Sequence, residues 1–341
     1  MRPSPPPDLL SIADLGPDLA AIVRRASEWK AERRRRRTAV ALAGRTLALV
    51  FEKSSTRTRV SFEVAMYELG GHAIFLSSRD LQLGRGETIA DTGRVLSRYV
   101  DAIAYRAMRH DDERALAAGA TVPVLNALDD REHPFQVVAD LLTLYEAWGG
   151  RFGGRRLAFI GDGNNVCNSL ALGAALVGLD FVAASPAGYA SPPEVQQEAK
   201  RLAAASGARI EWTTSPEAAA RGADALYTDV WVSMGDEAET DARMRAFDGY
   251  RIDAALLAQA APHVRVLHDL PAHRGLEITD DVIDGPQSLV WEQAENRLHA
   301  NKAVLEYFLA PRLASRGRAV PRRTGIVRRS APHRRRRPRV R

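Results

Sequence analysis

Two arginines and several hydroxyl side chains gather where an apolar segment, residues 47–51, gives way to a helix-like pattern. The stretch reads Ser55-Thr56-Arg57-Thr58-Arg59. At a strand-to-helix turn, unpaired backbone N–H groups and the positive end of the helix dipole point to one place. Hydroxyls add donors, and a guanidinium offers a planar pair of donors for phosphate oxygens. We therefore predict a phosphate site, although a helix cap beside two surface arginines would use the same residue types.

Six further stretches contain side chains able to bind or polarise a small anionic substrate. They are Tyr105-Arg106, His133-Pro134-Phe135-Gln136, Gly161-Asp162-Gly163-Asn164-Asn165, Asp229-Val230-Trp231-Val232-Ser233-Met234-Gly235, His268-Asp269-Leu270-Pro271 and Ala294-Glu295-Asn296-Arg297. Each has a structural explanation when it is taken singly, such as an ordinary ion pair for Arg106 or a turn residue for His133. Their joint occurrence is the informative observation.

Together with residues 55–59, these stretches resemble the motifs of the aspartate/ornithine carbamoyltransferase family, in the family's order and over about residues 8–310. Residues 229–235 are similar to the ornithine branch of the family. The resemblance implies transfer of the carbamoyl group of carbamoyl phosphate to the δ-amine of ornithine, giving citrulline and phosphate. It implies no cofactor and no metal. It also implies a homotrimer, because the segment around Gln82 is similar to a loop that family members insert into a neighbouring subunit's site.

Carbamoyl phosphate would be held by residues from both ends of the chain. By the resemblance, these residues are Ser55, Thr56, Arg57, Thr58, Gln82, Arg106, His133, Gln136 and Arg297. Within this set, Arg106, His133 and Thr58 would face the carbonyl oxygen, where negative charge grows, and Gln136 would bind the carbamoyl amino group. Phosphate is already a good leaving group, so the reaction needs two aligned substrates and a stabilised oxyanion rather than a covalent nucleophile.

The acceptor must be recognised as a zwitterion with a long amine arm. The residues implied for this are Asn165, Asp229, Ser233, Met234, Asp269 and Leu270. Asp229 could bind the α-ammonium group, while Asn165, Ser233 and the Met234 backbone could hold the carboxylate. Asp229 follows a predicted strand, at the edge where open α/β sheets bind ligands. The polar segment 233–240 predicts a loop that closes over the acceptor.

Asp269 departs from the family pattern, which has cysteine between the histidine and the leucine. A carboxylate there would raise the pKa of the attacking amine and disfavour the neutral nucleophile. It could instead accept the amine's proton as a catalytic base. It could also favour a diamine such as putrescine over an amino acid. We predict reduced or altered ornithine activity.

The whole chain alternates apolar strand-like segments with helical periodicity, which predicts an α/β fold with two doubly wound parallel sheets. The predicted strands are 45–51, 72–76, 102–105, 122–125, 156–160, 181–184, 209–213, 225–228 and 264–267, and the main helices are 58–69, 89–98, 111–119, 136–148, 168–177, 193–206 and 292–309. A glycine-rich hinge at 149–154 divides a carbamoyl-phosphate domain (1–148) from an ornithine domain (149–290). A last helix (291–312) is expected to return to the first domain, and a basic disordered tail (313–341) follows.

Charge and composition exclude several other classes. Residues 312–341 hold 13 of the 48 basic residues and none of the 42 acidic ones, so the net charge of +6 comes from the tail. No aromatic residue lies between these arginines, so nucleic-acid binding is not expected. The single cysteine excludes an internal disulfide, and no secretory or membrane-spanning apolar segment is visible, so we predict a cytoplasmic protein.

Two other functions stay open on sequence alone. Gly161-Asp162-Gly163 after a predicted strand suggests a nucleotide-dependent dehydrogenase, but Val166 occupies the position where that fingerprint needs a small residue. Asp269 and the basic tail would also suit a non-catalytic relative with the same fold. Arginine biosynthesis is the implied role, and the sequence does not distinguish it from arginine breakdown.

Overall fold

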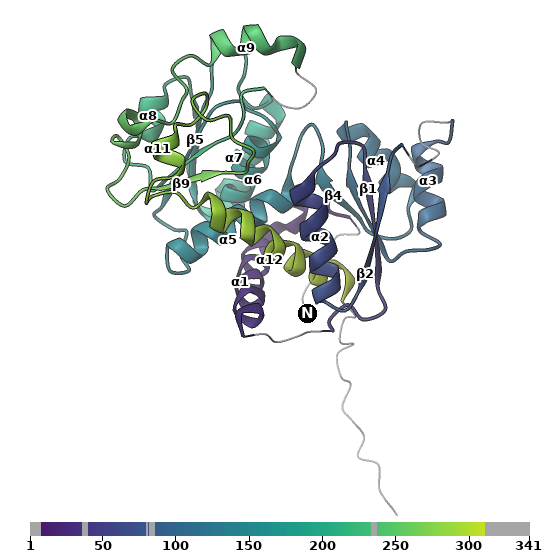
Figure 1. Cartoon of the computed structure of the whole chain (residues 1–341). Helices are drawn as coiled ribbons and strands as arrows, with labels where there is room; N and C mark the ends of the chain where they lie inside the picture. The colour runs from purple at the N-terminus through teal and green to yellow at the C-terminus, as the bar shows by residue number, and fades with distance from the viewer. Residues whose placement is uncertain (1–7, 36–39, 80, 82–85, 233–236, 311–341) are drawn as a thin grey trace, which may run out of the picture. The chain divides into compact units, whose positions relative to one another are not determined.

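The chain contains two parallel β-sheets, as predicted (Figure 1). The computed structural model describes residues 8–35, 40–79, 81, 86–232 and 237–310, so Gln82, Ser233, Met234, part of the predicted loop and the basic tail lie outside the described residues. The first sheet has the strand order β2-β1-β3-β4 and the second has the order β7-β6-β5-β8-β9. The strands are β1 (Thr46–Phe51), β2 (His72–Ser77), β3 (Ala102–Arg106), β4 (Val124–Leu128), β5 (Arg156–Ile160), β6 (Asp180–Ala184), β7 (Ile210–Thr213), β8 (Ala225–Thr228) and β9 (Arg265–His268).

Helices connect the strands, as the crossovers between parallel strands require. They are α1 (Leu19–Arg34), α2 (Thr56–Glu68), α3 (Ile89–Leu96), α4 (His110–Gly119), α5 (Pro134–Ala147), α6 (Asn165–Val177), α7 (Pro193–Ser206), α8 (Pro216–Ala220), α9 (Thr240–Ala246), α10 (Ala254–Leu257), α11 (Asp280–Ile283) and α12 (Val290–Leu309), with the 3-10 segments η1 (Ile12–Asp18) and η3 (Glu237–Glu239). None of the helices described here is long and apolar enough to span a bilayer.

Among the helices that begin earlier than the apolar pattern predicts, two are capped by polar side chains. The Ser55 side chain accepts a hydrogen bond from the Thr58 N–H, so α2 begins at Thr56. The Asn164 side chain accepts from the N–H groups of Val166 and Cys167, so α6 begins at Asn165. Both starts place site residues in the first turn of a helix, where free N–H groups face outward.

Each sheet reverses its winding direction at one place: between β1 and β3 in the first sheet, and between β5 and β8 in the second. The carboxyl ends of the strands beside such a point form a crevice in doubly wound folds. Most of the predicted site residues follow these strand ends or those of the neighbouring β4 and β9, whereas Arg297 lies within α12. Strand order therefore brings distant motifs to one edge of each sheet.

The last helix, α12, packs on α1, α2 and α5, which confirms the expected return to the first half. Asn301 Nδ2 donates to Ser61 Oγ of α2 at 2.9 Å, and Arg25 of α1 forms an ion pair with Glu306 at 2.7 Å. One cluster of buried apolar side chains includes Leu47 of the first sheet and Phe159 of the second. The predicted boundary at residues 148–149 stays a prediction.

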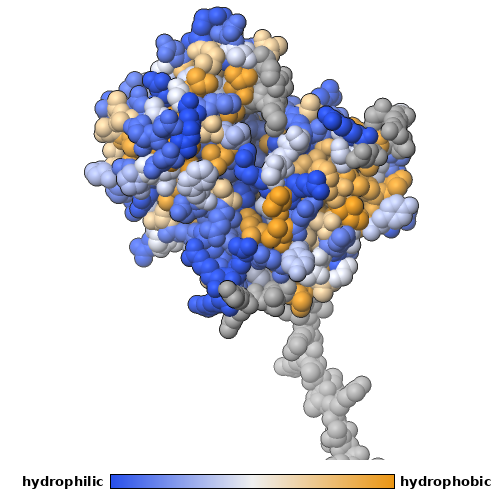
Figure 2. All heavy atoms as spheres, viewed as in Figure 1, coloured by the Kyte–Doolittle hydropathy of each residue, from blue (hydrophilic) through white to orange (hydrophobic). Residues whose placement is uncertain are grey.

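Strand β2 is an edge of the first sheet, and apolar side chains are exposed around it. Val60 and Tyr67 of α2 and Ile74 of β2 are 51%, 82% and 39% exposed. Figure 2 shows hydrophobic side chains gathered on this half of the chain. Exposed edges and apolar groups of this kind are places where another chain can pair.

Candidate active site

One cavity of about 420 Å³ collects most of the predicted site residues that the structure describes. Its lining is Lys53, Ser54, Ser55, Thr56, Arg57, Thr58, Arg106, Leu128, His133, Asn165, Val166, Asp229, Val230, Val232, Asp269, Leu270, Pro271, His273 and Arg297. These residues come from the ends of β1, β3, β4, β8 and β9, the first turns of α2 and α6, and the inner face of α12. Three arginines line it together with two aspartates, so the cavity carries both charges.

The first turn of α2 and the helix α12 meet at Thr58. Its Oγ1 accepts hydrogen bonds from Ser55 Oγ at 3.0 Å and from Arg297 Nη2 at 3.1 Å. Arg57 Nη2 donates to the backbone carbonyl of Leu270 at 2.7 Å, which ties this turn to the loop after β9. Leu270 has a φ of 61°, so its carbonyl is directed by a left-handed backbone conformation.

Arg57, Arg106 and Arg297 form a cationic cluster on one side of the cavity. Burial and the charges of Arg297 and Arg57 lower the pKa of Arg106 to about 10, so its guanidinium is still charged at neutral pH. The Nε atoms of Arg106 and Arg297 are buried, and neither has a hydrogen-bond partner in the part of the chain that the structure describes. Clustered cations repel one another, and a bound dianion would relieve this repulsion and accept from their N–H groups.

His133 lies immediately before α5 and is 3% exposed. Burial, followed by the charges of Arg297, Arg106 and Arg57, holds the pKa of His133 well below its usual range. The imidazole is therefore neutral at physiological pH and has one N–H to donate. A neutral donor beside Arg106 suits a developing oxyanion.

Gln136 is buried and is not among the residues that line the cavity. Its Oε1 accepts a hydrogen bond from Arg297 Nη1, and its Nε2 donates to Asp140 Oδ1 at 2.8 Å. Asp140 also accepts from Gln293 Nε2 at 2.7 Å and from the Tyr227 hydroxyl at 3.2 Å. In this geometry Gln136 orients Arg297, and its predicted contact with the carbamoyl amino group stays a prediction.

Asp229 and Asn165 supply polar groups on the second-sheet side of the cavity. Asp229 Oδ2 accepts from Asn164 Nδ2, and its Oδ1 accepts from the Val230 N–H, both at 2.7 Å. Burial and the charge of Asp269 raise the pKa of Asp229 well above its usual value. Asn165 Nδ2 donates to the Asp129 carbonyl at 2.7 Å. Asn164, which orients Asp229, lies in one of the stretches identified from the sequence but was not among the predicted site residues, although its place before a helix was a signal for a cap.

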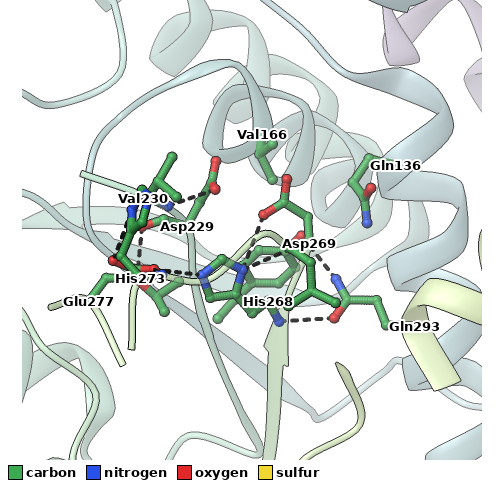
Figure 3. A network of polar contacts seen from close by, with 12 residues as sticks. Gln136, Val166, Asp229, Val230, His268, Asp269, His273, Glu277 and Gln293 are labelled. Carbon is green, nitrogen blue, oxygen red and sulfur yellow. Dashed lines mark hydrogen bonds and ion pairs between the residues drawn. The ribbon is translucent and has the colours of Figure 1, made fainter. Parts of the chain in front are cut away.

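Asp269 belongs to a buried network with His268 and Glu277 (Figure 3). His268 Nδ1 lies 2.9 Å from the Leu270 nitrogen and 3.5 Å from Asp269 Oδ1. A neutral ring would accept from Leu270 at this atom, whereas a protonated ring would face Asp269. Burial lowers the pKa of His268, but the neighbouring carboxylates of Asp269 and Glu277 raise it to about 9. The Leu270 N–H nevertheless points at Nδ1, so in this geometry that nitrogen accepts and the ring proton lies on Nε2, toward Glu277.

Two members of this network, His268 and Asp269, form with Asp229 the candidate metal site among the described residues. Asp229, His268 and Asp269 each place one ligand atom within 4.8 Å of the others. The lone pair of His268 Nδ1 accepts from the Leu270 N–H and is not free for a metal ion. The arrangement is therefore better suited to an ammonium group, which carboxylates bind directly.

Sequence reasoning also missed Lys53, Ser54 and His273, which line the cavity. Lys53 and Ser54 directly precede the predicted phosphate motif, and their types were a usable signal. Arg59 belongs to that motif but lies over the Phe75 ring at 3.8 Å and pairs with Glu63 at 3.0 Å.

Comparison with known proteins identifies the class to which this fold and cavity belong. The model of the aspartate/ornithine carbamoyltransferase carbamoyl-P binding domain matches residues 7–146. The model of the Asp/Orn binding domain of the same family matches residues 153–308. The chain therefore belongs to the aspartate/ornithine carbamoyltransferase family, which confirms the resemblance seen in its motifs.

Individual relatives narrow the comparison to one branch. An ornithine carbamoyltransferase of Methanoculleus marisnigri is 52% identical over 309 residues, covering 90% of this chain and 98% of the relative. One from Acidothermus cellulolyticus is 54% identical, covering 90% and 97%. The structure of ornithine carbamoyltransferase from Pyrococcus furiosus matches with a TM-score of 0.85 and 49% identity, covering 89% of this chain and 96% of that one.

Proposed function

We propose that this chain transfers the carbamoyl group of carbamoyl phosphate to the δ-amine of L-ornithine, releasing L-citrulline and phosphate. The observation that carries the proposal is one cavity lined by Arg57, Arg106 and Arg297 together with Asp229 and Asp269. The cations suit a phosphate dianion, and the carboxylates suit an ammonium group. The relatives named above, about half identical over nearly their whole length, support ornithine as the acceptor.

The amine nitrogen attacks the carbonyl carbon, and the C–O bond to phosphate breaks with its electron pair going to the phosphate oxygen. Ser55, Thr56, Arg57 and Thr58, with Arg297, hold the phosphate. Arg106 and His133 face the carbonyl oxygen, where an N–H from a neutral ring and a guanidinium stabilise the tetrahedral intermediate. The amine loses two protons along the reaction, one before attack and one after it.

The activity is tested by supplying carbamoyl phosphate with ornithine, putrescine or aspartate in parallel. Citrulline formed from ornithine, with little product from the other two, is the expected result. Product from putrescine alone would show that the acceptor is a diamine and not ornithine. Absence of product with all three amines would favour a non-catalytic relative of the family.

Replacing Asp269 by cysteine should raise turnover at neutral pH and move the rising limb of the pH–rate profile to lower pH. Burial alone would raise the pKa of Asp269, but the neighbouring His268 lowers it, so the carboxylate is charged at neutral pH. That charge raises the pKa of a nearby amine, whereas attack needs the neutral amine. Its removal should shift the limb by about one pH unit, or about tenfold in rate below the midpoint.

The profile is measured as kcat against pH with both substrates saturating. Asp269→Asn is the matched variant, because it removes the charge without adding a thiol and should shift the limb in the same direction. If the rising limb of the pH–rate profile stayed at the same pH in both variants, Asp269 would not control the protonation of the amine.

Assembly into a trimer is part of the proposal. It is supported by the edge position of β2 among the described strands and by the exposed Tyr67 and Val60. Tyr67→Glu should reduce the mass measured by sedimentation toward that of one chain, and should lower activity if Gln82 acts in a neighbour's site. A Tyr67→Glu protein that keeps the wild-type mass would place the contact elsewhere. A cytoplasmic location and a role in arginine biosynthesis complete the proposal.

A further inference from the structure

The segment that carries His133 is a short loop, residues 129–133, between β4 and α5. Asp129 organises it, because its Oδ1 accepts from the N–H groups of Arg131 and Glu132, both at 2.7 Å. The buried Nδ1 of the His133 ring, however, has no hydrogen-bond partner among the described residues. That atom therefore does not fix the orientation of the ring, which must be set by packing and by the backbone of His133.

Helix α6 holds this loop through three side chains at helical spacing. Asn165 Nδ2 donates to the Asp129 carbonyl at 2.7 Å, and Asn168 Nδ2 donates to the Arg131 carbonyl at 3.0 Å. Ser169 Oγ accepts from the His133 N–H at 2.9 Å. Residues three and four apart share one face of a helix, so the side chains that hydrogen-bond to the loop all lie on a single face of α6.

The Ser169 hydroxyl also donates to Glu132 Oε2 at 2.9 Å. That same oxygen accepts from the Ile12 N–H at 2.9 Å, which ties the contact to η1. Ser169 is 0% exposed, and both its donor and its acceptor functions are used within the loop. Removing the hydroxyl would leave the buried His133 N–H without an acceptor.

We propose that Ser169 is a positioning residue that sets the His133 imidazole at the carbonyl side of the cavity. It does so from the helix whose first residue, Asn165, lines the same cavity. Catalytic geometry in the first half is thereby held by a helix of the second half. The kinetic part of this inference rests on the proposed carbamoyl transfer, and its spectroscopic part does not.

The test compares Ser169→Ala and the nearly isosteric Ser169→Cys with the wild type and with Ser169→Thr, which keeps the hydroxyl. We expect kcat to fall about tenfold in the first two, as for a lost hydrogen bond to a buried donor, with the KM for carbamoyl phosphate nearly unchanged. Ser169→Thr should keep most of kcat. Ser206→Ala is the control, because its hydroxyl donates to the Ala175 carbonyl, away from the loop.

The second readout is the pKa of His133, measured by NMR of its imidazole. It should lie well below 6.5 in the wild type and rise toward that value in Ser169→Ala or Ser169→Cys, as the ring leaves its buried place beside the arginines. An inactive wild type would refute the proposed reaction, while the shift would still test the positioning. An unchanged His133 pKa with kcat within twofold of wild type, in whichever of the two variants folds, would overturn the inference.

Discussion

Replacing Arg106 by glutamine should lower kcat for citrulline formation by about 100- to 1,000-fold, the usual cost of losing one oxyanion donor. Arg106 is 4% exposed and lines the cavity together with His133 and Thr58. The fold should tolerate the change. Burial and the neighbouring charges of Arg297 and Arg57 already lower the pKa of Arg106, so its cation is disfavoured where it lies. Steady-state kinetics and thermal unfolding measure the two effects separately.

Arg109→Gln is the matched control, because Arg109 lies three residues further on and its side chain is 66% exposed. It should change neither kcat nor the unfolding temperature. If Arg106→Gln kept more than a tenth of the wild-type kcat, the carbonyl oxygen would have to be stabilised by other groups. His133 and Thr58 would then be the first to test.

Replacing Asp229 by asparagine should raise the KM for ornithine by about 10- to 100-fold, as expected for a lost hydrogen bond between charged groups. The KM for carbamoyl phosphate should change little, because the described residues proposed to hold it come from the start of α2, the end of β3, the start of α5, and α12. Asp229 is buried, and burial and the charge of Asp269 raise its pKa, so its negative charge does not stabilise the fold. The unfolding temperature should therefore stay level or rise.

Asp248→Asn provides the control, since this carboxylate is exposed in the same half of the chain. Kinetics with each substrate varied in turn give both KM values. A larger effect on carbamoyl phosphate than on ornithine would reverse the proposed assignment of the two sides of the cavity.

Much of the fold was predictable, because strand and helix periods are local properties of the chain. Arg156–Ile160, Ala225–Thr228 and Pro193–Ser206 were predicted with their observed bounds. Helix starts were less predictable, because a cap such as Asn164 acts through one side chain and leaves no periodic trace. The parallel pairing also followed, since strands separated by helices have few other ways to pair.

The sequence by itself determined which residue types were available: hydroxyls and arginines at one strand end, and carboxylates and amides at others. Only the tertiary structure decided their partners. The contact from Arg297 to Thr58 joins residues 239 positions apart, and the one from Arg57 to Leu270 joins residues 213 apart. Such pairs depend on strand order and on the return of α12, which no local pattern specifies. For the same reason, the hydrogen bond from the His133 N–H to Ser169 Oγ could be found only from the tertiary structure, which places α6 beside the loop before α5.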